Sequence, residues 1–171
     1  ATENYARSVT AAVPVSQPAS GVSASTAVTN VLCFGASTGA INLTPAGGTS
    51  PYTFNWGGGV TTEDRTNIAA GTYNVTVTDN NGCTATASAT ITQPASGVSA
   101  STAVTNVLCF GASTGAINLT PAGGTSPYTF NWGGGITTED RTNLAAGTYN
   151  VTVTDNNGCT TTANGTVTQP A

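Results

Sequence analysis

The chain has 171 residues, of which only 6% are charged, and it carries a net charge of −4 with no histidine and no lysine. A phosphate backbone requires clustered Lys and Arg side chains, so the composition excludes the usual nucleic-acid binders. The absence of histidine excludes His-based catalytic triads and His metal ligands. No apolar run is long enough to cross a bilayer, so membrane insertion is not expected.

The sequence contains no pattern typical of catalysis. No nucleophile has a neighbouring base, no pair of acids stands out, and no phosphate-binding loop is present. Val, Ile, Leu and aromatic residues instead recur in short runs separated by Gly, Pro and Asn, which predicts an all-β protein. We therefore expect a protein that is not an enzyme and that needs no cofactor and no metal.

Residues 1–19 resemble only the end of a larger unit. Their apolar residues alternate as they do in 85–91, which predicts that the segment is the final strand of a preceding unit. That unit would belong either to the same long chain or to a neighbouring copy in a filament that exchanges strands. The residues expected to form this inter-repeat or intersubunit strand are Val9, Ala11, Val13 and Val15.

The rest of the chain is one unit of 76 residues written twice, as residues 20–95 (repeat one) and 96–171 (repeat two). Such near-identity implies two copies of one fold rather than two parts with different tasks. The junction 93–97 is very short, so we expect adjacent units to be closely joined. The two copies differ at Val60/Ile136, Ile68/Leu144, Ala85/Thr161, Ser88/Asn164, Ala89/Gly165 and Ile91/Val167.

Each repeat shows strand-like stretches at short spacing and no helical period, which predicts a β-sandwich. The clearest is 71–78, where apolar residues alternate with Asn and Thr as in a half-buried strand. A tight turn is expected at 79–82, because Asp, Asn and Gly tolerate positive φ. The stretches expected in repeat one are Val22–Val31, Ala40–Thr44, 52–56, Val60–Thr62, Thr66–Ile68, 71–78 and Thr84–Thr92.

Aromatic residues on one side of two strands are the predicted core. Tyr52, Phe54 and Trp56 share one parity, so they face one side of their strand. They could instead form a platform on which sugars stack. Gly71-Thr-Tyr73 resembles a tyrosine corner, in which a Tyr hydroxyl bonds nearby backbone. The predicted core comprises Tyr52, Phe54, Trp56, Tyr73, Val75 and Val77, with Tyr128, Phe130, Trp132, Tyr149, Val151 and Val153 in repeat two.

The four cysteines fall two to a repeat, with no CxxC pair and no histidine for a zinc site. The simplest pairing is one bridge inside each repeat, Cys33 with Cys83 and Cys109 with Cys159. Such a bridge would stabilise a small unit by about 4 kcal/mol and would imply an oxidising compartment. The alternative is four buried free thiols.

Acidic residues offer a second candidate site. Glu63, Asp64 and Asp79 could ligate calcium, which takes six to eight oxygen ligands. They have no EF-hand spacing, and the competing interpretation is a solvated loop and a hairpin turn.

Several motifs together resemble one family. Cys33-Phe-Gly, the run 47–56 from Gly-Gly-Thr-Ser-Pro to Trp, the run 70–79, and Asn81-Gly-Cys83 occur in that order, and again in repeat two. They resemble the SprB repeat, a module of large secreted Bacteroidota surface proteins that include the gliding-motility adhesin. The resemblance implies an extracellular immunoglobulin-like or PKD-like sandwich and supplies no catalytic residues.

Repeats and resemblance together predict a structural role. We expect the chain to belong to a stiff extracellular array, in a stalk, fibre or filament at the cell surface, whose partners are neighbouring identical repeats. The alternative is a surface module that binds carbohydrate or a receptor.

Overall fold

A computed structural model describes residues 20–171, and within them every regular element is a β-strand, as predicted. The strands of repeat one are β1 (Ser23–Thr29), β2 (Gly39–Ala46), β3 (Thr53–Asn55), β4 (Arg65–Ile68), β5 (Gly71–Thr78) and β6 (Thr84–Ile91). Those of repeat two are β7 (Ser99–Thr105), β8 (Gly115–Ala122), β9 (Thr129–Asn131), β10 (Arg141–Leu144), β11 (Gly147–Thr154) and β12 (Thr160–Val167).

Each repeat is built from two antiparallel sheets of three strands. In repeat one the strand orders are β1-β2-β4 and β3-β5-β6, and in repeat two β7-β8-β10 and β9-β11-β12. Strand β1 also lies beside β6, where the Thr26 hydroxyl donates to the Ser88 carbonyl at 3.4 Å. The two sheets share one core, since Ile41 of β2 packs with Ile91 of β6. The sheets therefore face one another.

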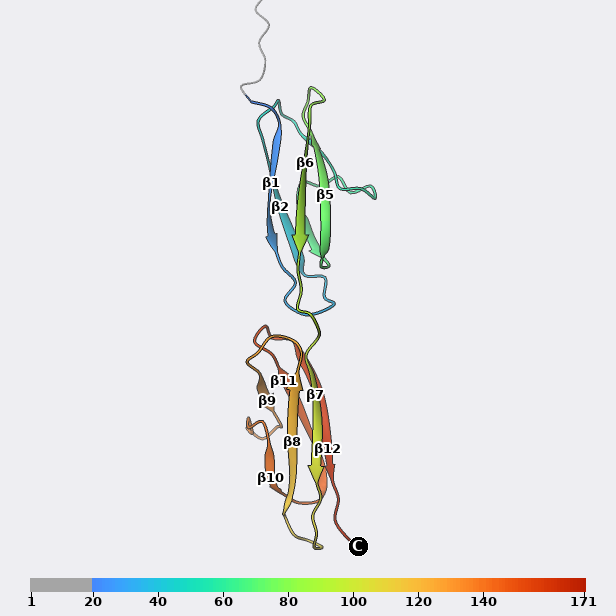
Figure 1. Cartoon of the computed structure of the whole chain (residues 1–171), viewed down its shortest axis with the longest axis vertical. Coiled ribbons are helices and arrows are strands. Elements are labelled where there is room, and N and C mark those ends of the chain that lie inside the picture. The colour runs from blue at the N-terminus through green and yellow to red at the C-terminus, as the bar shows by residue number, and fades with distance from the viewer. Residues whose placement is uncertain (1–19) are drawn as a thin grey trace, which may run out of the picture.

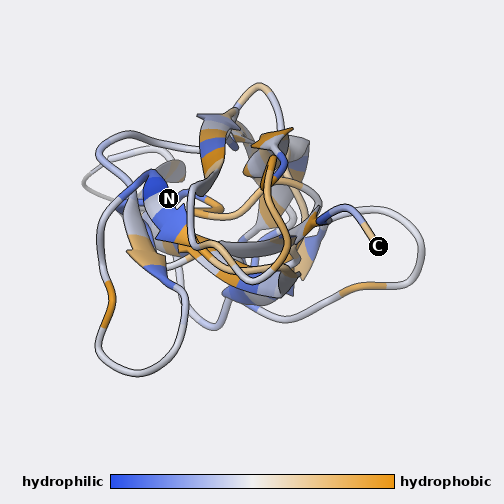
Figure 2. Ribbon diagram, turned by 90° about the horizontal axis from the view of Figure 1, so that it is seen from below, coloured by the Kyte–Doolittle hydropathy of each residue, from blue (hydrophilic) through white to orange (hydrophobic). Residues whose placement is uncertain are grey.

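The alternation of residue types explains why these strands form two layers. In β5, Val75 and Val77 are buried while their Asn and Thr neighbours face outward. Banding of hydrophobic and hydrophilic residues is visible along the strands when the molecule is viewed end on (Figure 2). Because successive side chains of a strand point to opposite faces, this pattern buries one face of each sheet.

One expected strand does not form. The prediction of a strand at 60–62 is wrong, because three glycines at positive φ reverse the chain after Trp56. The Trp56 amide donates to the Val60 carbonyl, and the Val60 amide donates to the Gly57 carbonyl, each at 3.1 Å. Residues 57–60 are consequently a tight turn that returns the chain to the end of β3.

The predicted aromatic residues lie around two neighbouring groups of buried side chains. Tyr52, Phe54 and Trp56 pack against Leu43, Val75 and Val77. Trp56 and Tyr73 pack against a second group, which consists of Val31, Ile41, Ile68, Ala89 and Ile91. Trp56 is the aromatic side chain that contacts both, and Trp132 holds the same position in repeat two. Tyr52, Phe54, Trp56 and Tyr73 are each half-buried.

The tyrosine corner expected from Gly71-Thr-Tyr73 is confirmed. The Tyr73 hydroxyl donates to the Ala69 carbonyl at 2.9 Å, and Tyr149 repeats this bond to Ala145 at 3.0 Å. The bond ties the entry of β5 to the chain segment that leaves β4.

The two repeats stack end to end along the long axis of the molecule (Figure 1). Strand β6 runs toward repeat two, and the chain continues directly into β7. The C-terminus lies at the end of repeat two that is farthest from repeat one. Within residues 20–171 there is no helix that could span a membrane.

The substitution of Ala89 by Gly165 provides a prediction about the core. A Cβ at Gly165 would lie 2.8 Å from Cδ1 and 3.1 Å from Cγ1 of Ile117, and 3.2 Å from Cγ2 of Val104, so these side chains must shift slightly. The equivalent Ala89 of repeat one is accommodated at 4% exposure. We expect Gly165→Ala to stabilise repeat two by about 0.4–1 kcal/mol, because alanine lowers the conformational entropy of the unfolded chain, so that less entropy is lost on folding.

The matched change Ala89→Gly should destabilise repeat one by about 0.5–1 kcal/mol, the usual cost of glycine inside a strand. Urea denaturation, with hydrogen exchange to assign each effect to its repeat, measures both changes. A loss of stability in Gly165→Ala would mean that Ile117 cannot move aside.

Candidate functional site: the joint between the repeats

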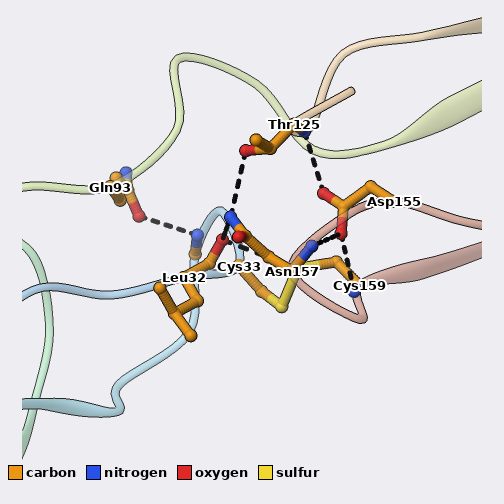
Figure 3. The surroundings of a disulfide bond; sticks show 8 residues. Leu32, Cys33, Gln93, Thr125, Asp155, Asn157 and Cys159 are labelled. Carbon is orange, nitrogen blue, oxygen red and sulfur yellow. Dashed lines mark hydrogen bonds between the residues drawn. A yellow bond between two sulfur atoms is a disulfide. The ribbon is translucent and has the colours of Figure 1, made fainter. Parts of the chain in front are cut away.

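Three segments meet where the repeats join. They are the loop 30–36 that follows β1, the linker 92–98 between the repeats, and the hairpin turn 155–159 between β11 and β12. The first belongs to repeat one, the last to repeat two, and the linker connects them (Figure 3). We call this arrangement the joint.

A disulfide closes the joint. Cys33 of the loop is bonded to Cys159 of the hairpin turn, 126 positions later in the sequence, with 5.6 Å between the Cα atoms. This Cα separation is in the middle of the range that disulfides adopt. The bridge therefore covalently connects repeat one to repeat two at a second place besides the linker (Figure 3).

The prediction of a bridge inside each repeat is wrong. Cys33 lies at the end of repeat one that faces repeat two, since the amide of Val31, two residues before it, donates to the carbonyl of Thr92, just after β6. Cys83 lies before the start of β6, at the opposite end. The eight residues of β6 span roughly 26 Å, whereas disulfide Cα atoms lie within about 7 Å. Consequently Cys33 and Cys83 cannot meet, and the same holds for Cys109 and Cys159.

The loop 30–36 is held by bonds to the end of β6 and to the linker. The Asn30 side-chain oxygen accepts from the Thr92 amide at 2.9 Å, and the Thr92 carbonyl accepts from the Val31 amide at 2.9 Å. The Gln93 side chain accepts from the Gly35 amide at 2.8 Å. These bonds place Cys33 and the carbonyl of Leu32 so that they face repeat two.

The hairpin turn is organised around Asp155, which is buried. Its Oδ1 accepts from the amides of Asn157 and Cys159, both at 2.9 Å, and its Oδ2 accepts from the Thr125 amide at 2.9 Å. Gly158 takes a φ of 82°, which closes the turn. The turn predicted from Asp-Asn-Asn-Gly is therefore present, and the carboxylate fixes the backbone that carries Cys159.

Polar contacts cross the joint beside the disulfide. The Asn157 amide group donates to the Leu32 carbonyl at 3.1 Å and to the Thr125 hydroxyl at 3.0 Å, so it links both repeats. The Leu32 oxygen also lies 3.5 Å from Sγ of Cys159, a contact and not a hydrogen bond, because a bridged sulfur carries no hydrogen. Phe34 lies against Gly97 of the linker. The joint thus combines a covalent bond, a hydrogen bond and apolar contact.

The two buried aspartates make stability depend on pH. The Thr49 amide, with further amides of the turn, lowers the pKa of Asp79 below 3.8. Burial opposes ionisation of Asp155, but backbone donors led by Thr125 outweigh it and lower that pKa as well. Because the folded pKa lies below the unfolded one, the stabilisation is complete above about pH 4 and is lost as pH falls further.

We therefore expect the melting temperature to fall as the pH drops below about 4, because protonation of these carboxylates then favours the unfolded chain. The doubly substituted chain Asp79→Asn with Asp155→Asn should melt lower at neutral pH and lose less on acidification. Calorimetry across this range checks both effects. Equal acid sensitivity of the variant and the natural chain would contradict the assignment to these carboxylates.

The other predicted sites have ordinary structural roles or lie elsewhere. Asp64 accepts from the Leu43 amide at 2.9 Å, and Glu63 is exposed. In the described part of the chain, no group of three or more acidic or cysteine side chains is placed to hold a metal. The strand predicted from Val9, Ala11, Val13 and Val15 lies outside the described residues.

Sequence reasoning missed several residues of the joint. The sequence predicts the hairpin turn that contains Asn157 and the short junction that begins at Gln93, but not the contacts that either residue makes. The contacts of both depend on which ends of the strands meet, which a repeat pattern does not reveal. The very short junction was the one available signal, since it predicts that neighbouring units touch.

Comparison with known protein families identifies the repeats. The SprB repeat family matches residues 25–61 and again residues 101–137. Each match begins within the first strand of its repeat and ends just after the glycine turn, so it covers β2, β3 and the loop that carries the first cysteine. No curated protein matches the chain.

Proposed function

From the premise that this chain carries two SprB repeats, we propose that it is a structural segment of an extracellular surface fibre or stalk. Such repeats are typical of the repeat regions of surface adhesins. In this role the repeats provide length and mechanical continuity, and they are partners of one another. A location outside the cell accords with the disulfide, since disulfides persist in oxidising compartments.

The observation that carries the proposal is the joint. A flexible string of units would need only the linker, yet here the end of one repeat is also bridged to the next through Cys33 and Cys159. The bridge and the Asn157 bond restrict bending between the repeats. A restricted joint turns a series of small units into a stiff element.

Binding of carbohydrate or a receptor is the alternative function. Trp56 could serve as a stacking platform, but its indole Nε1 donates to the Thr62 carbonyl at 2.8 Å. The Arg65 guanidinium lies over the same ring, 5.8 Å from its centroid, and over Tyr73 at 4.8 Å. The indole is therefore engaged within its own repeat, which favours the structural role.

Small-angle X-ray scattering tests the structural role. The natural chain should be an extended, stiff particle, and the matched variant Cys33→Ser with Cys159→Ser should bend more while each repeat stays folded. A compact or equally flexible natural chain would contradict the proposal. Specific binding on a glycan array would support the alternative.

A further inference from the structure

The loop and the hairpin turn that meet at the joint both occur in each repeat, but within residues 20–171 only one loop and one turn are joined. Repeat one contributes the loop with Cys33, and repeat two contains the same loop with Cys109. Repeat two contributes the hairpin turn with Cys159, and repeat one contains the same turn with Cys83. Cys83 and Cys109 are exposed free thiols. Cys83 directly precedes β6 and Cys109 lies in the loop that follows β7, and the start of β6 and the end of β7 are at opposite ends of the stacked repeats (Figure 1).

The turn that carries Cys83 has the same conformation as the turn that carries Cys159 at the joint. Asp79 accepts from the Cys83 amide at 2.8 Å, and the Asn81 side chain donates to the Thr49 hydroxyl at 3.0 Å, as Asn157 does to Thr125. Gly82 has a φ of 84°, against 82° in the joined turn. The face of repeat one that carries this turn is therefore preformed, although within residues 20–171 Asn81 has no counterpart of the Leu32 carbonyl to donate to.

The loop that carries Cys109 is equally preformed. The Val107 amide donates to the Thr168 carbonyl at 2.9 Å, and the Gly111 amide donates to the Gln169 side chain at 3.0 Å. These are the bonds that hold the Cys33 loop in the joint. The conformation of the loop thus does not depend on the presence of a neighbouring repeat.

What differs is the coverage of the apolar side chains. Leu32 is 55% exposed in the joint, whereas its equivalent Leu108 is 83% exposed. Phe34 is 52% exposed, and its equivalent Phe110 is 74% exposed. Since the two loops have the same sequence and the same hydrogen bonds, the difference measures what a neighbouring repeat covers. The free end of repeat two exposes the surface that is covered at the joint.

We infer that these two end faces each take a further copy of the same repeat, stacked as repeats one and two are stacked. Cys109 then bridges to the second cysteine of the following copy, and Cys83 bridges to the first cysteine of the preceding copy. The inference rests on the proposed structural role and specifies the covalent bonds that join successive repeats. Each repeat would be disulfide-bonded to its neighbours on both sides and would contain no bridge of its own.

Each new bridge requires a two-electron oxidant, which a small-molecule disulfide such as oxidised glutathione supplies. The Cys109 thiolate attacks one sulfur of that disulfide, forms a mixed disulfide and releases one glutathione thiolate. The thiolate of the neighbouring copy then attacks the Cys109 sulfur and releases the second. Two protein thiols are oxidised to one disulfide, and one glutathione disulfide is reduced to two thiols.

The test extends the full chain with a second copy of residues 96–171 placed directly after Ala171. This junction reproduces the sequence of the existing linker. After refolding in a glutathione redox buffer, non-reducing peptide mapping should find Cys33 linked to Cys159, and Cys109 linked to the second cysteine of the added copy. Cys83 and the first cysteine of the added copy should remain free thiols.

Two matched variants of the extended chain sharpen the result. Cys109→Ser should leave the second cysteine of the added copy reactive toward a thiol reagent, whereas Cys83→Ser should leave the new bridge intact. In a third variant, alanine at the added copy's counterpart of Asn157 should slow formation of the bridge severalfold. The rate at which Cys109 reacts with the small reagent should stay the same, which separates docking from thiol reactivity.

The inference is overturned if the added copy bridges its own two cysteines, or if Cys109 stays a free thiol. Scattering on the same sample separates the two proposals. An extended particle without the new bridge refutes this inference and leaves the structural role in place. A compact or freely bending particle refutes the structural role itself.

Discussion

Pulled at its two ends, the oxidised chain should lengthen by roughly 400 Å less than the reduced chain. The load enters at the N-terminus, reaches Cys33, crosses the disulfide to Cys159 and leaves at the C-terminus. The segment between the two cysteines, which are 126 positions apart, is therefore outside the load path. An extended chain spans about 3.3–3.6 Å per residue, which gives the size of the effect.

Single-molecule force spectroscopy measures this difference directly. The double variant Cys33→Ser with Cys159→Ser should extend fully under oxidising conditions, as the reduced natural chain does. The single variant Cys83→Ser should behave as the natural chain, because Cys83 is not part of the bridge. Equal contour lengths for the oxidised and reduced natural chain would show that the joint does not shield the repeats from load.

Replacement of Trp56 by alanine should destabilise repeat one by about 3 kcal/mol, near the lower end of the range for emptying a buried aromatic site. The indole is half-buried and contacts both groups of buried side chains, so its removal leaves a cavity beside each group. It also removes the bond to the Thr62 carbonyl and the contact with the Arg65 guanidinium. No other single side chain of repeat one connects as many parts of the core.

Hydrogen exchange followed by mass spectrometry measures this effect repeat by repeat. Peptides from residues 20–95 should lose protection in Trp56→Ala, while peptides from 96–171 should be little affected, and Trp132→Ala should give the reverse. Trp56→Phe should fall between the natural chain and the alanine variant. Unchanged protection in Trp56→Ala would indicate an exposed platform and would favour the carbohydrate-binding alternative.

Much of the internal structure of a repeat could be predicted from the sequence, because it depends on local patterns. Alternation along β5 determines which residues of that strand are buried, and Asp-Asn-Asn-Gly determines the turn that follows. Gly-Thr-Tyr predicted the bond from the Tyr73 hydroxyl to the backbone. The strand expected at 60–62 was wrong, because three glycines allow a reversal that β-propensity alone does not predict.

The pairing of the cysteines was decided only by the tertiary structure. The sequence shows two cysteines in each repeat, and pairing within a repeat closes the shorter loop. Yet β1 and β6 lie side by side with their C-terminal ends at the same end of the repeat, as the Val31–Thr92 bond shows. This places Cys33 one strand length away from Cys83. Repeat two has the same arrangement, so its second cysteine, Cys159, lies at the end that faces repeat one. Stacking of the two copies therefore brings Cys33 next to Cys159.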